Sequence, residues 1–131
     1  MHPRKLPERV YAAIQDHDLV MNQHTGAGIP DHGDSLDGQA IWISEVAYYA
    51  QAGYRYLLLG GVFERYPRLK YIITESGCSW AGPLLKSLDQ IHENMLRGSA
   101  GEIFYDNSAW PLKERPSDYA KRCCFYGASF P

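Results

Sequence analysis

The sequence lacks the features that mark membrane-spanning, secreted and nucleic-acid-binding proteins. Its longest apolar cluster, residues 54–63, is too short to cross a bilayer. The first ten residues, MHPRKLPERV, contain no apolar core of the kind found in signal peptides. Thirteen basic residues stand against fifteen acidic ones, with a formal net charge of -2 and no basic run. We therefore expect a soluble, cytoplasmic protein that binds neither nucleic acid nor membranes.

Paired cysteines and the common catalytic signatures are also missing. The three cysteines, Cys78, Cys123 and Cys124, form no CxxC pattern, and the last two are adjacent. This usage indicates reduced thiols and no zinc–cysteine cluster. No HExxH, GxSxG, GxxxxGK[ST] or GxGxxG pattern occurs, so neither a serine hydrolase nor a nucleotide-binding protein has support.

What the sequence does contain is an alternation of strand and helix patterns. Apolar strands are predicted at residues 19–23, 69–74 and 123–130. Strands joined by helical crossovers predict a parallel sheet with outer helices. Helices are predicted at residues 6–17, 40–52, 54–66, 80–95 and 116–122. Gly53 is expected to separate the second helix from the third. The predicted N-caps are Ser35 or Asp37 for the second helix, Ser79 for the fourth and Ser117 for the fifth.

The predicted fold class is α/β, as a partial (β/α)8 TIM barrel. Three parallel strands would leave two unpaired edges and an uncovered face, and a whole barrel takes about 250 residues. Residues 1–131 are therefore expected to form a single partial domain, a fragment of a larger barrel. Barrel sites form at the carboxyl ends of the strands, and these ends carry His24, Glu75 and Ser129 here.

His24 ends the first predicted strand, where a barrel places functional groups. An imidazole there can bind a metal through one nitrogen while a neighbouring group orients the other. Gly26 and Gly28 are expected to leave room for the metal or a substrate. The alternative is a histidine that closes the strand by bonding a backbone carbonyl.

Glu75 ends the second predicted strand and precedes the small residues Ser76 and Gly77. A carboxylate at this place can coordinate a divalent ion, act as a general acid or base, or orient a histidine. The alternative is a structural salt bridge across the ends of the strands.

Two further residues are candidates for contacting a substrate. Trp80, at the start of the next helix, would form an apolar wall of the site, or else a core tryptophan that fixes the helix to the sheet. His32 lies between Asp31 and Asp34 in the long loop after His24. Such a loop contacts substrate in many enzymes, although its polar residues are usually solvated.

Three stretches together resemble one known family. They are NQHTGAG (22–28), GGVFERYPRLKYIITESGCSWAGPLL (60–85) and ERPSDYAKRCCFYGASF (114–130). In this order they resemble the C-terminal half of the amidohydrolase-2 group, the amidohydrolase-related TIM barrels that include aminocarboxymuconate-semialdehyde decarboxylase.

The resemblance implies that the predicted strands are the fifth to seventh of a barrel. It also implies that His24 ligates a divalent metal, commonly zinc. Glu75 stands where the decarboxylases place a catalytic histidine, and this departure puts decarboxylation in doubt. The family's His-x-His or Glu-x-His of the first strand and the aspartate of the eighth are not in the chain. A catalytic zinc takes about three protein ligands, so the site is expected to be incomplete here.

The predicted function is that of a fragment of a metal-dependent hydrolase acting on a small organic substrate. One alternative is a decarboxylase of a carboxylated aromatic or muconate-type substrate. Another, of a different class, is a non-catalytic half-barrel or degenerate paralogue. The chain alone is expected to be inactive. Its expected binding partner is a small-molecule substrate, and a homo-oligomer is a further possible state.

Overall fold

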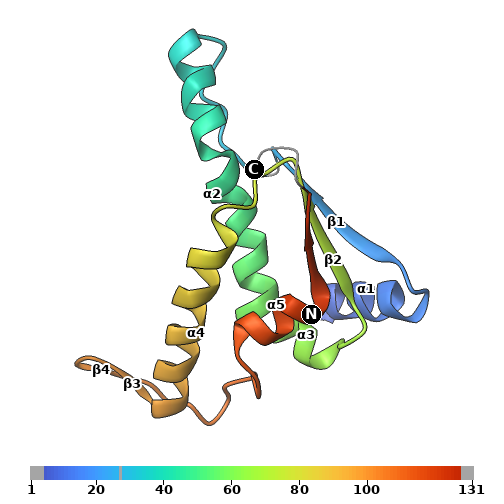
Figure 1. Cartoon of the computed structure of the whole chain (residues 1–131), viewed down its shortest axis with the longest axis vertical. Helices are drawn as coiled ribbons and strands as arrows, with labels where there is room; N and C mark the ends of the chain where they lie inside the picture. The colour runs from blue at the N-terminus through green and yellow to red at the C-terminus, as the bar shows by residue number, and fades with distance from the viewer. Residues whose placement is uncertain (1–4, 27, 128–131) are drawn as a thin grey trace.

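The computed structural model describes residues 5–26 and 28–127 (Figure 1). It contains a parallel sheet in the order β1-β2-β5, made of β1 (Val20–His24), β2 (Lys70–Thr74) and β5 (Cys124–Tyr126). The three predicted strands and their parallel arrangement are confirmed. The end of the third predicted strand, including Ser129, lies outside the described residues.

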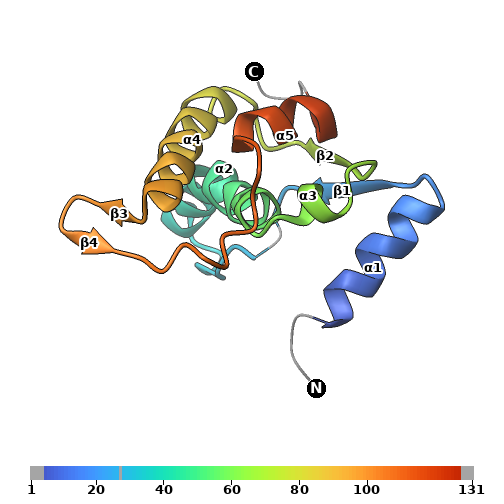
Figure 2. The ribbon, with the colours of Figure 1, turned by 90° about the horizontal axis from the view of Figure 1, so that it is seen from below.

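Helices precede and connect these strands, as the alternating pattern predicted. Figure 2 shows α2, α4 and α5 side by side, and these helices also contact one another pairwise. The helices of the described residues are α1 (Lys5–Asp16), α2 (Leu36–Leu59), α3 (Val62–Arg65), α4 (Ala81–Arg97) and α5 (Pro116–Cys123). None of them combines the length and the apolar character that a membrane crossing needs.

The long helix α2 runs without interruption through Gly53, so the predicted break there is wrong. A Cβ on Gly53 would lie 2.5 Å from Oε1 of Gln23 on β1. Gln23 occupies this space, donating from Nε2 to the Ala50 carbonyl oxygen at 3.0 Å and accepting a hydrogen bond from the Tyr71 hydroxyl. Glycine therefore serves here for close approach of helix and strand, not for a turn.

The helix starts agree only in part with the predicted caps. Ser35 is the N-cap of α2, and its hydroxyl accepts a backbone N–H hydrogen bond. Ser79 is not the cap of α4, because the helix begins after Trp80. Ser117 is not the cap of α5, because Arg115 holds that position. The backbone N–H of Ser117 donates instead to a carboxylate on α4.

The sheet buries one face and exposes the other. Side chains alternate along the strands, and Tyr71, Ile73 and Cys124 point into the core formed with the helices. On the opposite face, Val20 is 54% exposed and Phe125 is 49% exposed. The predicted uncovered face is thus present in the described part of the chain.

A short antiparallel hairpin follows α4, in a stretch for which the sequence predicted neither a helix nor a strand. Its strands are β3 (Ser99–Ala100) and β4 (Ile103–Phe104). Gly101 makes the turn with a φ of 59°, a left-handed value that glycine adopts without strain. The hairpin projects from the body of the molecule (Figures 1 and 2), and Phe104 is 81% exposed.

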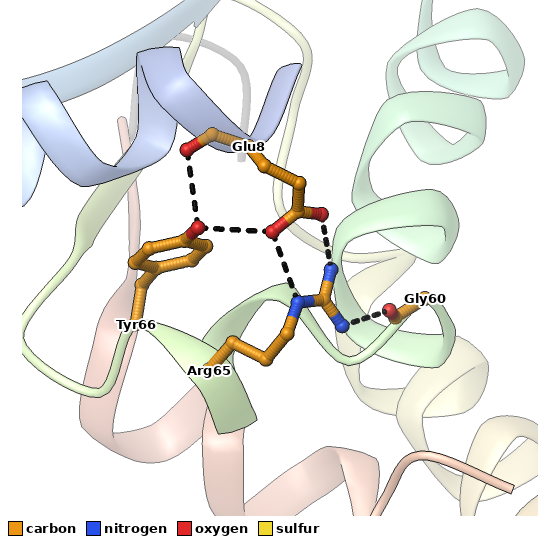
Figure 3. Close-up of polar contacts among 4 residues, drawn as sticks. All are labelled: Glu8, Gly60, Arg65 and Tyr66. Atoms are coloured by element: carbon orange, nitrogen blue, oxygen red, sulfur yellow. Dashed lines mark hydrogen bonds and ion pairs between the residues drawn. The ribbon is translucent and has the colours of Figure 1, made fainter. Parts of the chain in front are cut away.

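Helix α1 is tied to the rest of the chain by the polar cluster that Figure 3 shows. The Arg65 guanidinium donates to both carboxylate oxygens of Glu8, at 2.7 and 3.1 Å, and to the Gly60 carbonyl oxygen at 2.9 Å. The Tyr66 hydroxyl donates to Glu8 at 2.9 Å. The bidentate guanidinium holds the pKa of the Glu8 carboxyl below its usual value. One glutamate therefore joins α1 to the corner between α2 and α3.

Candidate functional site

His24 and Glu75 come together because β1 and β2 are neighbours in a parallel sheet. His24 pairs in register with Thr74, so the residue after Thr74 leaves the sheet beside the imidazole. The His24 Nε2 and Glu75 Oε2 atoms lie 3.3 Å apart, with 60% and 50% of the two side chains exposed. The structure thus brings together the two residues predicted as metal ligand and catalytic group, at an accessible end of the sheet.

The backbone at Glu75 is unusual. Its φ is 55°, in the left-handed region that residues other than glycine seldom occupy. Such strained positions persist where the surrounding structure holds them, and they cluster at functional sites. This turn directs the carboxylate back toward His24 of the neighbouring strand.

The glycines after His24 do not leave the free space that the sequence predicted. Gly26 and Gly28 have φ values of 88° and 84° and form the turn out of β1. A Cβ on Gly26 would lie 3.4 Å from Cζ2 of Trp42, and one on Gly28 would lie 3.8 Å from Cδ1 of Tyr49. The room beside these glycines therefore holds aromatic side chains of α2.

The two nitrogens of His24 face different groups. Nδ1 lies 3.3 Å from the backbone carbonyl oxygen of Thr25. A carbonyl oxygen can only accept, so this contact is a hydrogen bond in the forms of the imidazole that carry a proton on Nδ1. Nε2 lies 3.3 Å from Glu75 Oε2. The carbonyl contact of the alternative interpretation is present, and it leaves Nε2 available as a ligand.

An open cavity of about 520 Å³ lies between the first half of α2 and the loop after β2. Thr25, Glu75 and Trp80 line it together with an aromatic and aliphatic face of α2. A second cavity of about 640 Å³ adjoins His24 and Thr25. Within the described residues, the Thr25 hydroxyl is a buried oxygen without a hydrogen-bond partner. A buried hydroxyl in that position is suited to bonding a ligand or water.

Trp80 packs against the core and also lines a cavity, while its predicted contact with substrate stays a prediction. Its indole N–H donates to the Ser76 carbonyl oxygen at 2.9 Å, and its ring packs edge-on against Tyr54 at 5.5 Å and Tyr126 at 6.3 Å. The same side chain lines the cavity beside Glu75. Trp80 is therefore an apolar wall of the cavity that is fixed by the core.

The tyrosines behind Trp80 are structural donors rather than bases. The Tyr54 and Tyr126 hydroxyls are hydrogen-bonded to each other. Burial, with this hydrogen bond as the next cause, raises the pKa of Tyr54 far above its ordinary value. Burial likewise raises the pKa of Tyr71. These phenols remain protonated and hold α2 against the sheet.

His32 is placed apart from this pair. Its Nε2 lies 2.8 Å from Glu45 Oε2 on α2, in a half-buried hydrogen-bonded pair. It lines a smaller cavity of about 310 Å³ with Trp42 and Ile43. The predicted contact of His32 with substrate therefore stays a prediction, and in this structure the residue fastens its loop to α2.

The donor set at the strand ends suits a divalent metal such as zinc. An imidazole nitrogen and a carboxylate oxygen are both common zinc ligands, and both atoms are accessible here. Across residues 5–26 and 28–127, no group of three or more His, Cys, Asp and Glu side chains is arranged to hold an ion. His24 and Glu75 thus fit as two ligands of such a site.

Similarity to known proteins was found in structure and not in sequence. No protein-family model matches the chain, and no curated protein does. An amidohydrolase from Mycobacterium avium subsp. paratuberculosis K-10 aligns over 92% of the chain and 29% of its own length, with a TM-score of 0.64 and 18% identity. The 5-carboxyvanillate decarboxylase of Sphingomonas paucimobilis aligns over 89% and 33%, with a TM-score of 0.62 and 24% identity.

The chain has the fold of part of a (β/α)8 barrel. The predicted resemblance to amidohydrolase-related barrels is confirmed at the level of the fold. The partial barrel spans about a third of the length of these two enzymes. In such barrels the functional residues lie at the carboxyl ends of the strands, where His24 and Glu75 are found.

Two residues of the site were missed by sequence reasoning. Thr25 directly follows His24, and its position at a strand end was a sufficient signal to include it. Trp42 was not predicted to contact the turn after β1, because that contact depends on the path of the loop before α2, which the sequence does not reveal. The glycine at 26 was the available signal, since it accommodates the Trp42 ring.

Proposed function

We propose that this chain is the segment of a metal-dependent amidohydrolase-superfamily hydrolase that contributes His24 as a metal ligand and Glu75 as its acidic partner. The observation that carries the proposal is the convergence of His24 Nε2 and Glu75 Oε2, 3.3 Å apart, at the carboxyl ends of adjacent parallel strands. The likeness in fold to an amidohydrolase and a decarboxylase supports it.

The residues of the chain would have different roles in the site. His24 and Glu75 would hold a divalent ion, which supplies a Lewis acid for polarising a substrate carbonyl or activating water. Glu75 Oε2 is also accessible enough to accept and return a proton. Trp80 would exclude water from one side of the cavity, and the Thr25 hydroxyl would bond a polar group of the substrate.

Hydrolysis of an uncharged substrate group is favoured over decarboxylation by the cavity beside Glu75. None of its described lining residues is a lysine or an arginine, and the charged residue among them is Glu75 itself. A carboxylated substrate would meet the Glu75 carboxylate there and no basic side chain among the described lining residues, which leaves the metal ion as its single counterion. Decarboxylation remains the second candidate, because one similar enzyme is a decarboxylase.

The proposal also covers the substrate class, the partners and the location of the enzyme. We infer a small-molecule substrate, no nucleic-acid or membrane partner, and a cytoplasmic location. The location is supported by the cysteines, all three of which are free thiols. A homo-oligomer is compatible with the apolar groups that the sheet and the hairpin expose.

Zinc titration of the chain with and without His24 tests the function. We expect the chain to bind zinc weakly, because two protein ligands are fewer than the three of a catalytic site. His24→Ala should abolish this binding while the circular dichroism spectrum and the melting temperature stay unchanged, since the side chain is 60% exposed. His32→Ala is the matched control and should bind zinc as the wild type does.

Two results would count against the proposal. Zinc binding that is unchanged in His24→Ala would remove the metal role of His24 and favour a non-catalytic half-barrel. Stoichiometric zinc that resists chelators in the wild-type chain would contradict the incomplete ligand set.

A further inference from the structure

The first half of α2 projects from the molecule and exposes apolar side chains. Figure 1 shows its first turns extending beyond the ends of the sheet and of α4. Leu36, Ile41 and Tyr48 are 86%, 45% and 60% exposed. A helix with apolar side chains on several sides is normally covered by another part of a protein. The first half of α2 therefore presents an apolar surface that the described residues leave open.

One side of this half of α2 is covered by the loop that precedes it. His32 Nε2 lies 2.8 Å from Glu45 Oε2, and Gln39 Nε2 donates to the Asp34 carbonyl oxygen at 2.9 Å. The Trp42 ring packs on the turn after β1. By the periodicity of an α-helix, these side chains leave on the side opposite to the exposed Ile41 and Tyr48 side. The open side is thus a distinct face of the helix.

The open face has the residue spacing of a helix that packs against another helix. Its residues recur at alternating intervals of four and three, the spacing of a helix–helix seam. They are Asp37, Ile41, Ser44, Tyr48, Gln51 and Arg55. In the middle of this seam, the Ser44 hydroxyl donates to the Ile41 carbonyl oxygen at 2.7 Å. The centre of the seam therefore presents no unpaired donor to a packed helix.

The seam carries one charge of each sign, at its two ends. Arg55 is half-buried, and its Nη2 donates to Gln51 Oε1 at 2.8 Å, yet no carboxylate of the described residues pairs with it. Asp37 lies about 21 Å from Gln51 along the helix axis. A seam that is acidic at one end and basic at the other is complementary to a second copy of itself that runs in the opposite direction.

The side chains along the seam are also complementary in size when two copies run antiparallel about Ser44. This arrangement places Ile41 opposite Ala47 of the second copy, and Ala40 opposite its Tyr48. Each large side chain then meets a small one, as ridges meet grooves in packed helices. The two-fold symmetry repeats every pairing, so one favourable contact occurs twice.

From these observations we infer that the chain forms a homodimer in which the first half of α2 packs antiparallel against α2 of a second copy. Ser44 lies at the crossing point, and Asp37 of each copy faces Arg55 of the other. The inference goes beyond the proposed function and does not depend on a metal. Ser44 and Ala47 also line the cavity beside Glu75, so the second copy lies against the α2 side of this cavity.

Sedimentation velocity of the full chain over a concentration series tests the homodimer. We expect a reversible equilibrium between monomer and dimer. Tyr48→Glu places a charge in the seam and should raise the dissociation constant about tenfold or more. Circular dichroism should show an unchanged fold, because Tyr48 is 60% exposed. Phe104→Glu, on the exposed hairpin, is the matched control and should dimerise like the wild type.

Charge reversal tests the pairing of Asp37 with Arg55. Asp37→Arg and Arg55→Asp should each weaken the dimer, because like charges then meet at both ends of the seam. The chain with both substitutions should dimerise more tightly than either single variant, since the ion pairs are restored with their signs exchanged. A merely structural role of either residue would not produce this rescue.

Crosslinking tests the antiparallel direction. With a short bismaleimide, Ser44→Cys should link two copies beyond the level that the wild-type cysteines give. Asp37→Cys should not, because the two copies of residue 37 lie about 21 Å apart in the antiparallel dimer.

Three results would overturn the inference. A chain that stays monomeric throughout the series leaves this face to another protein or segment. A dimer that Phe104→Glu breaks and Tyr48→Glu does not would be formed by a different surface. Crosslinking through Asp37→Cys, or no rescue in the double charge reversal, would exclude the antiparallel packing.

Discussion

Gly53 lies in the interior of α2, where glycine usually lowers stability, yet at this position glycine stabilises the fold. In most helix interiors, replacing glycine by alanine adds about 1 kcal/mol of stability. At Gly53 the added methyl group would meet Gln23 Oε1 at 2.5 Å. The polar contacts of Gln23 with Ala50 and Tyr71 would then be displaced.

We therefore expect Gly53→Ala to destabilise the chain. Losing the two Gln23 hydrogen bonds costs about 0.5–1.5 kcal/mol each, which together outweigh the gain in helix propensity. Gly82, near the start of α4, has no atom within 4 Å of an added Cβ and supplies the control. Urea unfolding should show a lower midpoint for Gly53→Ala and an equal or higher one for Gly82→Ala; a stabilised Gly53→Ala variant would refute the close approach.

His92 is a buried residue whose ionisation should govern stability in acid. It is 3% exposed, and its Nδ1 accepts a hydrogen bond from the Trp110 indole at 3.0 Å. Burial, the largest cause, and Arg115 lower the pKa of His92 against the opposing effects of Asp89 and Glu93. The neutral imidazole is therefore the form that the fold requires.

Because the folded pKa lies below the unfolded one, the contribution of His92 should be complete above about pH 6.5. It should be lost as the pH falls through the lowered pKa, since a protonated Nδ1 cannot accept from Trp110. The stability of His92→Phe should vary less with pH in this range than that of the wild type. Unfolding curves followed by tryptophan fluorescence between pH 4 and 8 measure the difference, and identical pH profiles would exclude His92 as the cause.

At the scale of elements, α1 is docked in part by a polar cluster. Its Glu8 meets Arg65 and Tyr66 (Figure 3), while none of its residues 8–16 is fully buried. A bidentate pair with an additional phenol is worth more than an ordinary surface pair of about 0–1 kcal/mol. The cluster therefore adds to the core packing of Tyr11 and Ile14 in docking α1.

Arg65→Ala should loosen α1 and leave the sheet intact. We expect a loss of about 1 kcal/mol in unfolding free energy and faster amide hydrogen exchange in residues 8–16, with β2 unchanged. Arg68→Ala is the control, because Arg68 and Asp16 lie 3.9 Å apart with 69% of each side chain exposed. Equal exchange in both variants would show that the cluster does not anchor α1.

The elements also show what sequence patterns can and cannot reveal. The strands were predictable because short apolar runs ended at polar or small residues. The continuity of α2 was not, because the role of Gly53 depends on Gln23, thirty positions earlier and on another element. The β3–β4 hairpin was not predicted because its strands contain two residues each, too few to show the alternating pattern of a strand.

At the scale of the whole molecule, the sheet topology made part of the site predictable. Parallel strands have their carboxyl ends at one edge of the sheet, so the positions of His24 and Glu75 at strand ends assigned both residues to that edge, and the pairing of β1 with β2 brings them into contact. The place of His32 was not predictable, because it follows a loop whose path depends on a hydrogen bond to Glu45. Loops carry no periodic signal that would reveal such a partner.

The parallel pairing of β1 with β2 has a further consequence for the speed of folding. Val20 pairs with Lys70 and His24 with Thr74, so each contact closes a loop of about fifty residues before it contributes stability. The local hydrogen bonds of α2, which lies within that loop, form much sooner. We therefore expect the contact between His24 and Glu75 to form later than the local contacts of α2, when β1 pairs with β2.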